Sequence, residues 1–193
     1  MSETMITPAA AVFSDVTLSK AAELAADSYL PLWIGPSGEE SSGEAVARHL
    51  EATIALLEQD GWIRVYDYNR DWSTGGVDIA DDDSMTVKDM LRALLRFVRD
   101  ESESGTGSGP QRTLSTALRH VGEDGAHGDT DTACVAGYVL DRLIQAHTGS
   151  DSARATPWSE RQHRTHADIT ALLAAGARFA RTYGPGATAG SAA

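Results

Sequence analysis

Apolar residues recur at every third or fourth position along most of this chain, a spacing that predicts amphipathic helices. The most regular stripe covers residues 86–98. The last stripe, over residues 165–183, starts with Thr165 and Asp168, whose spacing matches a capping box at a helix N-terminus. Weaker stripes predict further helices over residues 18–30, 41–60, 111–121 and 130–147. The chain is therefore expected to be all-α, or nearly so, as a compact bundle of five or six helices.

Two places interrupt this pattern. Residues 62–66 are β-prone and partly alternating, so one short β segment is expected there. Gly176 lies on the apolar stripe of the last helix, where glycine weakens a helix by roughly 1 kcal/mol relative to alanine. We therefore expect Gly176 to mark a close approach to a neighbouring element.

The polar, glycine-rich stretches set the expected domain limits. Residues 1–17 show little periodicity and are expected to be a flexible N-terminus. A single helical domain is expected over residues 18–184, because neither half of it has enough helices to close a core alone. Residues 101–110 are expected to form a flexible loop within this domain, and residues 185–193 a disordered tail.

Composition narrows the cellular setting. The chain has 193 residues, of which 41% are hydrophobic, enough to bury a core. No run of apolar residues is long enough to span a membrane, and no basic and apolar leader begins the chain. The single cysteine, Cys134, cannot form an intramolecular disulfide. These features predict a cytoplasmic protein with no membrane partner.

The net charge of −12 is unevenly placed. Residues 1–110 carry 20 acidic and 8 basic residues, and the remainder of the chain is balanced. Acidic runs repel phosphates, so a nucleic-acid partner is not expected.

Three pieces of the sequence resemble a family of small actinobacterial proteins known only as a domain of unknown function. The first is a helix that ends in Gly-Trp, residues 50–62, and the second is an apolar helix around residues 90–94. The third is a Trp-polar-acid turn, residues 158–160, followed by Arg164-Thr165 and a closing helix. The resemblance covers roughly residues 46–180 and implies a compact, mostly helical fold with no activity attached. Arginine far outnumbers lysine in this chain, and alanine is common, which is typical of translation from GC-rich DNA.

One loop imitates a calcium-binding loop. Oxygen-bearing side chains occupy its first, third, fifth and twelfth positions, as Asp67, Asn69, Asp71 and Asp78. Trp72 stands at the sixth position, where a calcium loop needs glycine for its sharp turn. A polar loop that joins two elements is the alternative interpretation.

A second group of possible metal ligands lies around the start of a predicted helix. His120, His127, Asp129, Asp131 and Cys134 offer nitrogen, oxygen and sulfur donors of the kinds that transition metals bind. Their spacing matches no common ligand pattern. Asp129 and Asp131 are alternatively explained as acids that face the positive end of the helix dipole, and Cys134 as a small core residue.

These observations favour a non-catalytic adaptor or regulator that binds another macromolecule, most directly a protein, and needs no cofactor. Its expected contacts are Trp72 and the acidic run Asp81, Asp82 and Asp83, on an exposed apolar or acidic patch without a convergent polar pocket. A metal-dependent enzyme that uses the clustered His and Asp residues is one alternative. An acidic DNA mimic is another, because all of the net charge lies in residues 1–110.

Overall fold

A computed structural model describes residues 13–65, 86, 88, 91 and 111–187 of the chain. These residues form an all-α fold, as the hydrophobic pattern predicts. The helices are α1 (Asp15–Ala26), α2 (Gly43–Asp60), α4 (Leu114–Asp124), α5 (Thr130–Thr148), α6 (Ala155–Ser159) and α7 (His166–Tyr183).

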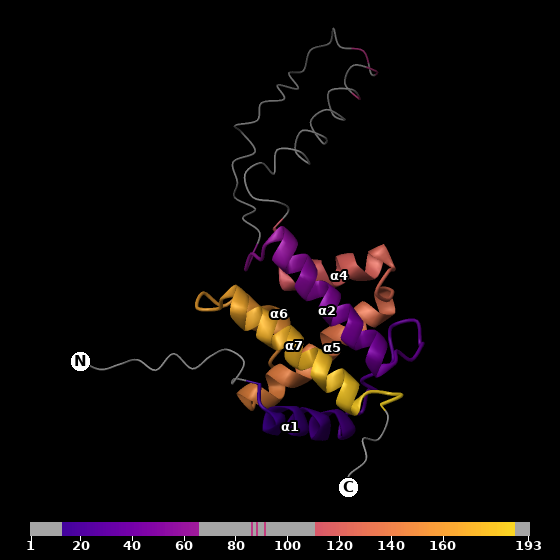
Figure 1. Ribbon diagram of the computed structural model, residues 1–193, viewed down its shortest axis with the longest axis vertical. Coiled ribbons are helices and arrows are strands. Elements are labelled where there is room, and N and C mark those ends of the chain that lie inside the picture. The colour runs from indigo at the N-terminus through magenta and orange to yellow at the C-terminus, as the bar shows by residue number, and fades with distance from the viewer. Residues whose placement is uncertain (1–12, 66–85, 87, 89–90, 92–110, 188–193) are drawn as a thin grey trace, which may run out of the picture.

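Helix α5 is the centre of the bundle. It packs against each of the other five helices named above, and α2 and α7 pack against each other beside it. In Figure 1, α1 and α4 lie at opposite ends of this arrangement. The side chains that α5 contributes to the core are small or branched, with Val135, Val139, Leu140, Leu143 and Ile144 fully buried. This broad apolar face explains why the other helices can surround α5.

Side-chain caps fix where the helices begin. The capping box predicted at the last helix is present, because the Thr165 hydroxyl accepts from the Asp168 amide and the Asp168 carboxylate accepts from the Thr165 amide. Thr113 and Thr116 form an equivalent box at α4. Helix α2 is capped by the hydroxyl of Ser42, which accepts from the amide of Ala45 at 3.2 Å.

Two glycines allow α7 to approach α2 and α5 closely. A Cβ at Gly176 would lie 2.8 Å from Leu140 Cδ2 and 3.0 Å from Leu50 Cδ1, so the expectation of a close approach there is confirmed. A Cβ at Gly43 would lie 2.2 Å from the carbonyl oxygen of Ala180. Arg181 adds ion pairs to Glu44 and Glu51 across the same interface, at 2.9 and 2.6 Å.

The first helix differs from its predicted limits. It begins at Asp15 and ends at Ala26, whereas the pattern predicts residues 18–30. Phe13, within the stretch expected to be flexible, is only 2% exposed and packs against His147 and Trp158. At the other end of this helix, the residues after Ala26 form a loop rather than the predicted last helical turn.

Smaller differences concern the remaining elements. The β segment expected at residues 62–66 is, among the described residues, a single parallel bridge between Trp62 and Arg112. The short helix α6 was not predicted and places Trp158 in the core. The predicted helix over residues 86–98 lies largely outside the described residues, as do the whole of 101–110 and most of the tail.

Candidate functional site

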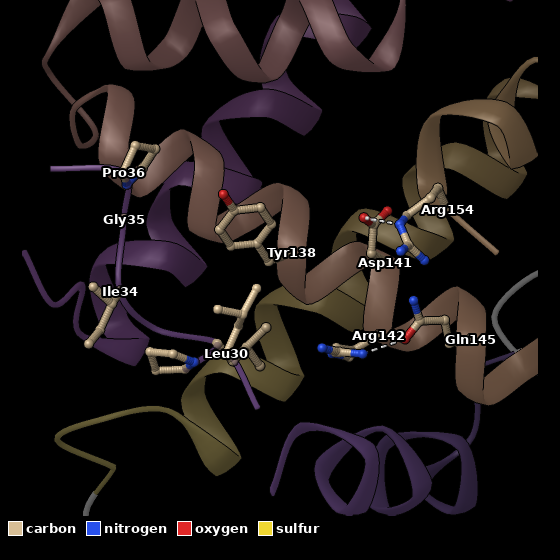
Figure 2. A pocket seen from close by; sticks show the side chains of 11 residues that line it. Leu30, Ile34, Gly35, Pro36, Tyr138, Asp141, Arg142, Gln145 and Arg154 are labelled. Carbon is tan, nitrogen blue, oxygen red and sulfur yellow. Dashed lines mark hydrogen bonds and ion pairs between the residues drawn. The ribbon is translucent and has the colours of Figure 1, made fainter. Parts of the chain in front are cut away.

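A pocket of about 480 Å³ lies between the loop that joins α1 to α2 and one side of α5. Its volume is in the range of ordinary ligand sites, roughly 300–1,000 Å³. Figure 2 shows its lining side chains. The apolar wall consists of Leu30, Pro31, Leu32, Ile34, Pro36 and Tyr138, and the polar end of Asp141, Arg142, Gln145 and Arg154.

The loop wall of the pocket is held in place by Asp131, in the first turn of α5. The carboxylate of Asp131 accepts from the Ser37 amide, at 3.2 and 3.3 Å, and from the Ser37 hydroxyl. A Cβ at Gly35 would lie 2.5 Å from the Asp131 side chain, so only glycine lets the loop come this near. The wall is therefore formed before any ligand binds.

Asp141 lies at the polar end of the pocket and faces Arg154 in Figure 2. It accepts from the Ala155 amide at 2.7 Å and forms an ion pair with Arg154 at 3.4 Å. Burial raises the pKa of Asp141, while the Ala155 amide and the charges of Arg154 and Arg142 oppose the rise. Because Arg154 offers no side-chain cap to α6, Asp141 performs that role from α5.

Arg142 is half-buried and held by neutral partners. Its Nη1 donates to Gln145 Oε1 at 2.8 Å, and its Nη2 donates to Ser28 Oγ at 2.7 Å. Gln145, only 3% exposed, in turn donates to the carbonyl oxygen of Ala153 at 3.3 Å. This chain of hydrogen bonds joins the end of α1, α5 and the segment before α6, and it fixes the position of the guanidinium.

Large apolar side chains are exposed at the rim of the pocket. Leu30 is 70% exposed, and Ile34 and Tyr138 are also exposed. Tyr29, next to Leu30, is almost fully exposed. Exposed apolar side chains that gather around a concave site, rather than scattering singly, indicate an interaction surface.

The residues of the second predicted metal group have separate roles in the structure. Asp129 caps α5 by accepting from the Thr132 amide at 2.8 Å, and Asp131 holds the pocket loop as described above. His120 is exposed, and Cys134 is partly buried. Within residues 13–65 and 111–187, no three His, Cys, Asp or Glu side chains are grouped so that they could hold a metal ion.

His127 contributes its backbone rather than its ring. Its carbonyl oxygen lies 3.2 Å from Nδ1 of His49, and the carbonyl oxygen of Leu118 lies 3.0 Å from Nε2 of the same ring. His49 is fully buried on α2. Burial lowers its pKa, against the two carbonyl groups and Asp129, which raise it.

The other predicted site residues lie outside the part of the chain that the structure describes. These are the calcium-loop residues Asp67, Asn69, Asp71 and Asp78, and the predicted partner contacts Trp72, Asp81, Asp82 and Asp83. The calcium loop and the acidic patch therefore stay predictions.

A second hollow, of about 660 Å³, lies between Trp62 and Arg164. The Arg164 guanidinium stacks 3.8 Å from the centre of the buried Trp158 ring. The rim of this hollow includes Val65, where a described stretch of chain ends. The first pocket is the better candidate site, because described residues define its wall and its polar end.

Sequence reasoning missed the first pocket. Tyr138, Asp141, Arg142 and Gln145 follow the spacing i, i+3, i+4 and i+7, which is one face of a helix and resembles an ordinary solvent face. The stronger signal is the loop at residues 30–36. Leu, Trp and Ile occur there between two prolines, where no helix can bury them, so they must cover another surface.

Comparison with known proteins gives a family without an activity. No described helix is long and apolar enough to cross a membrane. No curated protein and no solved structure matches the chain. A family model described as "Family of unknown function (DUF6197)" matches residues 41–179, well over half of the sequence. The chain therefore belongs to this family of unknown function.

Proposed function

We propose that the protein is a non-catalytic, cytoplasmic adaptor or regulator that binds a short segment of another protein in the pocket between the α1–α2 loop and α5. The observation that carries this proposal is the apolar rim around a preformed concave site. Leu30 extends into solvent beside the pocket, and Tyr138 faces it from α5.

Recognition of a peptide needs an apolar anchor site and some polar groups that fix orientation. Both kinds of group are present, at opposite ends of one pocket. The loop wall is preorganised by Asp131, so the loop itself loses little conformational entropy when a partner binds.

The polar groups support binding more than catalysis. Catalysis by a carboxylate requires that it reach a reacting atom. Asp141 is engaged by the Ala155 amide and by Arg154, and Gln145 is engaged by Arg142 and the Ala153 carbonyl. The sequence predicts a binding patch without a convergent polar pocket. The site found differs from this prediction, because its polar residues converge, although they bind one another.

The proposal is tested by selection from a phage-displayed library of random nonapeptides on immobilised protein. We expect peptides with a large apolar residue to be enriched on the wild-type protein. Leu30→Asp should reduce their binding by about tenfold or more, because it places a charge against the apolar anchor.

Val16→Asp provides the matched control. Val16 is 78% exposed, much like Leu30, but lies on α1 and does not line the pocket. The selected peptides should bind this variant as they bind the wild-type protein. Equal binding to the wild-type protein and to Leu30→Asp would contradict the proposal.

A further inference from the structure

Resting on the function proposed above, we infer that the bound segment carries an acidic side chain beside its apolar anchor, and that Arg142 receives this carboxylate. The inference names the chemistry of the partner: a peptide with a large apolar residue and an Asp or Glu close to it in sequence. The inference rests on Arg142, whose hydrogen-bond partners are neutral.

Arg142 forms no ion pair among the described residues, although its charge lowers the pKa of the neighbouring Asp141. The ion pairs there involve Arg48, Arg112, Arg119, Arg154, Arg178 and Arg181. Asp141, next to Arg142 in sequence, is directed to Arg154 and the Ala155 amide instead. The Arg142 guanidinium is half-buried and donates to an amide oxygen and a hydroxyl oxygen, neither of which neutralises its charge.

The arrangement leaves Arg142 able to bind a carboxylate. Two hydrogen bonds, to Gln145 and Ser28, fix the plane of the guanidinium. The group has more N–H donors than these two bonds use, and its planar fork matches the geometry of a carboxylate. Because its position is already fixed, binding costs less rotamer entropy than it would for a free surface arginine.

The two ends of the pocket together set the expected sequence pattern. Leu30, Ile34 and Tyr138 offer contacts to an apolar side chain, and Arg142 lies on the same side of α5 as Tyr138 (Figure 2). One short segment can therefore reach both groups. Charge-assisted hydrogen bonds are about twice as strong as neutral ones, so the carboxylate is expected to add selectivity to the apolar contact.

The test compares the peptides selected on the wild-type protein with those selected on Arg142→Gln. In the library, each peptide is joined to the coat protein through its C-terminus, so no free terminal carboxylate can substitute for a side chain. We expect Asp and Glu near the apolar residue to be enriched on the wild-type protein. On Arg142→Gln the apolar residue should remain enriched and the acid should not.

The most enriched peptide is then synthesised with blocked ends, together with its Glu→Gln or Asp→Asn partner. By fluorescence anisotropy, the acidic form should bind the wild-type protein about tenfold more tightly than its partner, and the two should bind Arg142→Gln equally. Arg142→Lys should keep part of the preference, since it keeps the charge but loses the fork. Arg119→Gln, at an exposed pair on α4, should keep all of it.

The outcomes separate the two proposals. If apolar peptides bind the pocket but show no acidic preference, or show the same preference on a folded Arg142→Gln protein, this inference is wrong and the proposed function stands. If no peptide prefers the wild-type protein over Leu30→Asp, the proposed function fails, and this inference fails with it. Circular dichroism of each variant confirms that the helices are intact.

Discussion

The two sides of α5 differ in how their neighbours approach. On the side of α7, Leu140 is fully buried and packs against the space left by Gly176, so the helices are in close contact. On the side of the α1–α2 loop, Tyr138 and Arg142 line a pocket of about 480 Å³. The same helix therefore packs into the core on one side and lines an open pocket on the other.

The difference follows from the residues that each neighbour places against α5. Helix α7 presents glycine and alanine, which let its backbone come close. The loop at residues 30–36 contacts the first turn of α5, where Gly35 and Ser37 meet Asp131. The pocket lies farther along the helix, between this loop and the side chains of Tyr138 and Arg142. Stability is expected to depend on the first side, and binding on the second.

The largest effect that would sharpen this comparison is at Leu140. Leu140→Ala should lower the free energy of unfolding by about 2–5 kcal/mol, because it leaves a cavity in the core. Tyr138→Ala, two residues away but exposed on the pocket side, should change it by about 0.5 kcal/mol or less. Urea denaturation measures both. Similar losses at the two positions would show that the pocket side also supports the fold.

Alanine substitutions at two glycines, Gly43 and Gly137, should change the free energy of unfolding in opposite directions. Gly43→Ala should lower the free energy of unfolding by roughly 1–3 kcal/mol, because its Cβ would meet the Ala180 carbonyl at 2.2 Å. Gly137→Ala should raise it by about 0.5–1 kcal/mol, because nothing lies within 4 Å of the added Cβ and α5 gains helix propensity. The same denaturation experiment compares them. A stabilised Gly43→Ala protein would contradict the close contact of α2 with α7.

The smallest of these effects depends on pH. Burial lowers the pKa of His49, so the unfolded chain binds its proton more readily than the folded protein does. The stabilisation from neutral His49 is present above the ordinary histidine pKa of about 6.5 and is lost as the pH falls below it. The free energy of unfolding should therefore decrease on acidification.

His49→Gln should reduce this dependence, measured by urea denaturation at a series of pH values. His163→Gln, at an exposed position, is the control. A dependence that is equal in wild-type and His49→Gln proteins would show that His49 does not contribute to it.

The sequence predicts those parts of the fold that local signals specify. The α7 cap follows from Thr165 and Asp168, and the contact at Gly176 from a glycine that the helix itself does not favour. The pocket depends instead on residues that are distant in sequence. Ser28 and Arg142, or Ser37 and Asp131, carry no local pattern that shows they will meet. For the same reason, the sequence shows Asp131 only as a residue of a type that binds metals, whereas in the structure it holds a loop.

The central claim is that the pocket beside α5 is the binding surface. It is tested most directly by titrating ¹⁵N-labelled protein with the most enriched peptide and following the amide chemical shifts. We expect the largest shifts in residues 30–36 and 138–145, on both walls of the pocket, and their loss in Leu30→Asp. Shifts concentrated on α2 and α7, with residues 30–36 unchanged, would contradict the account.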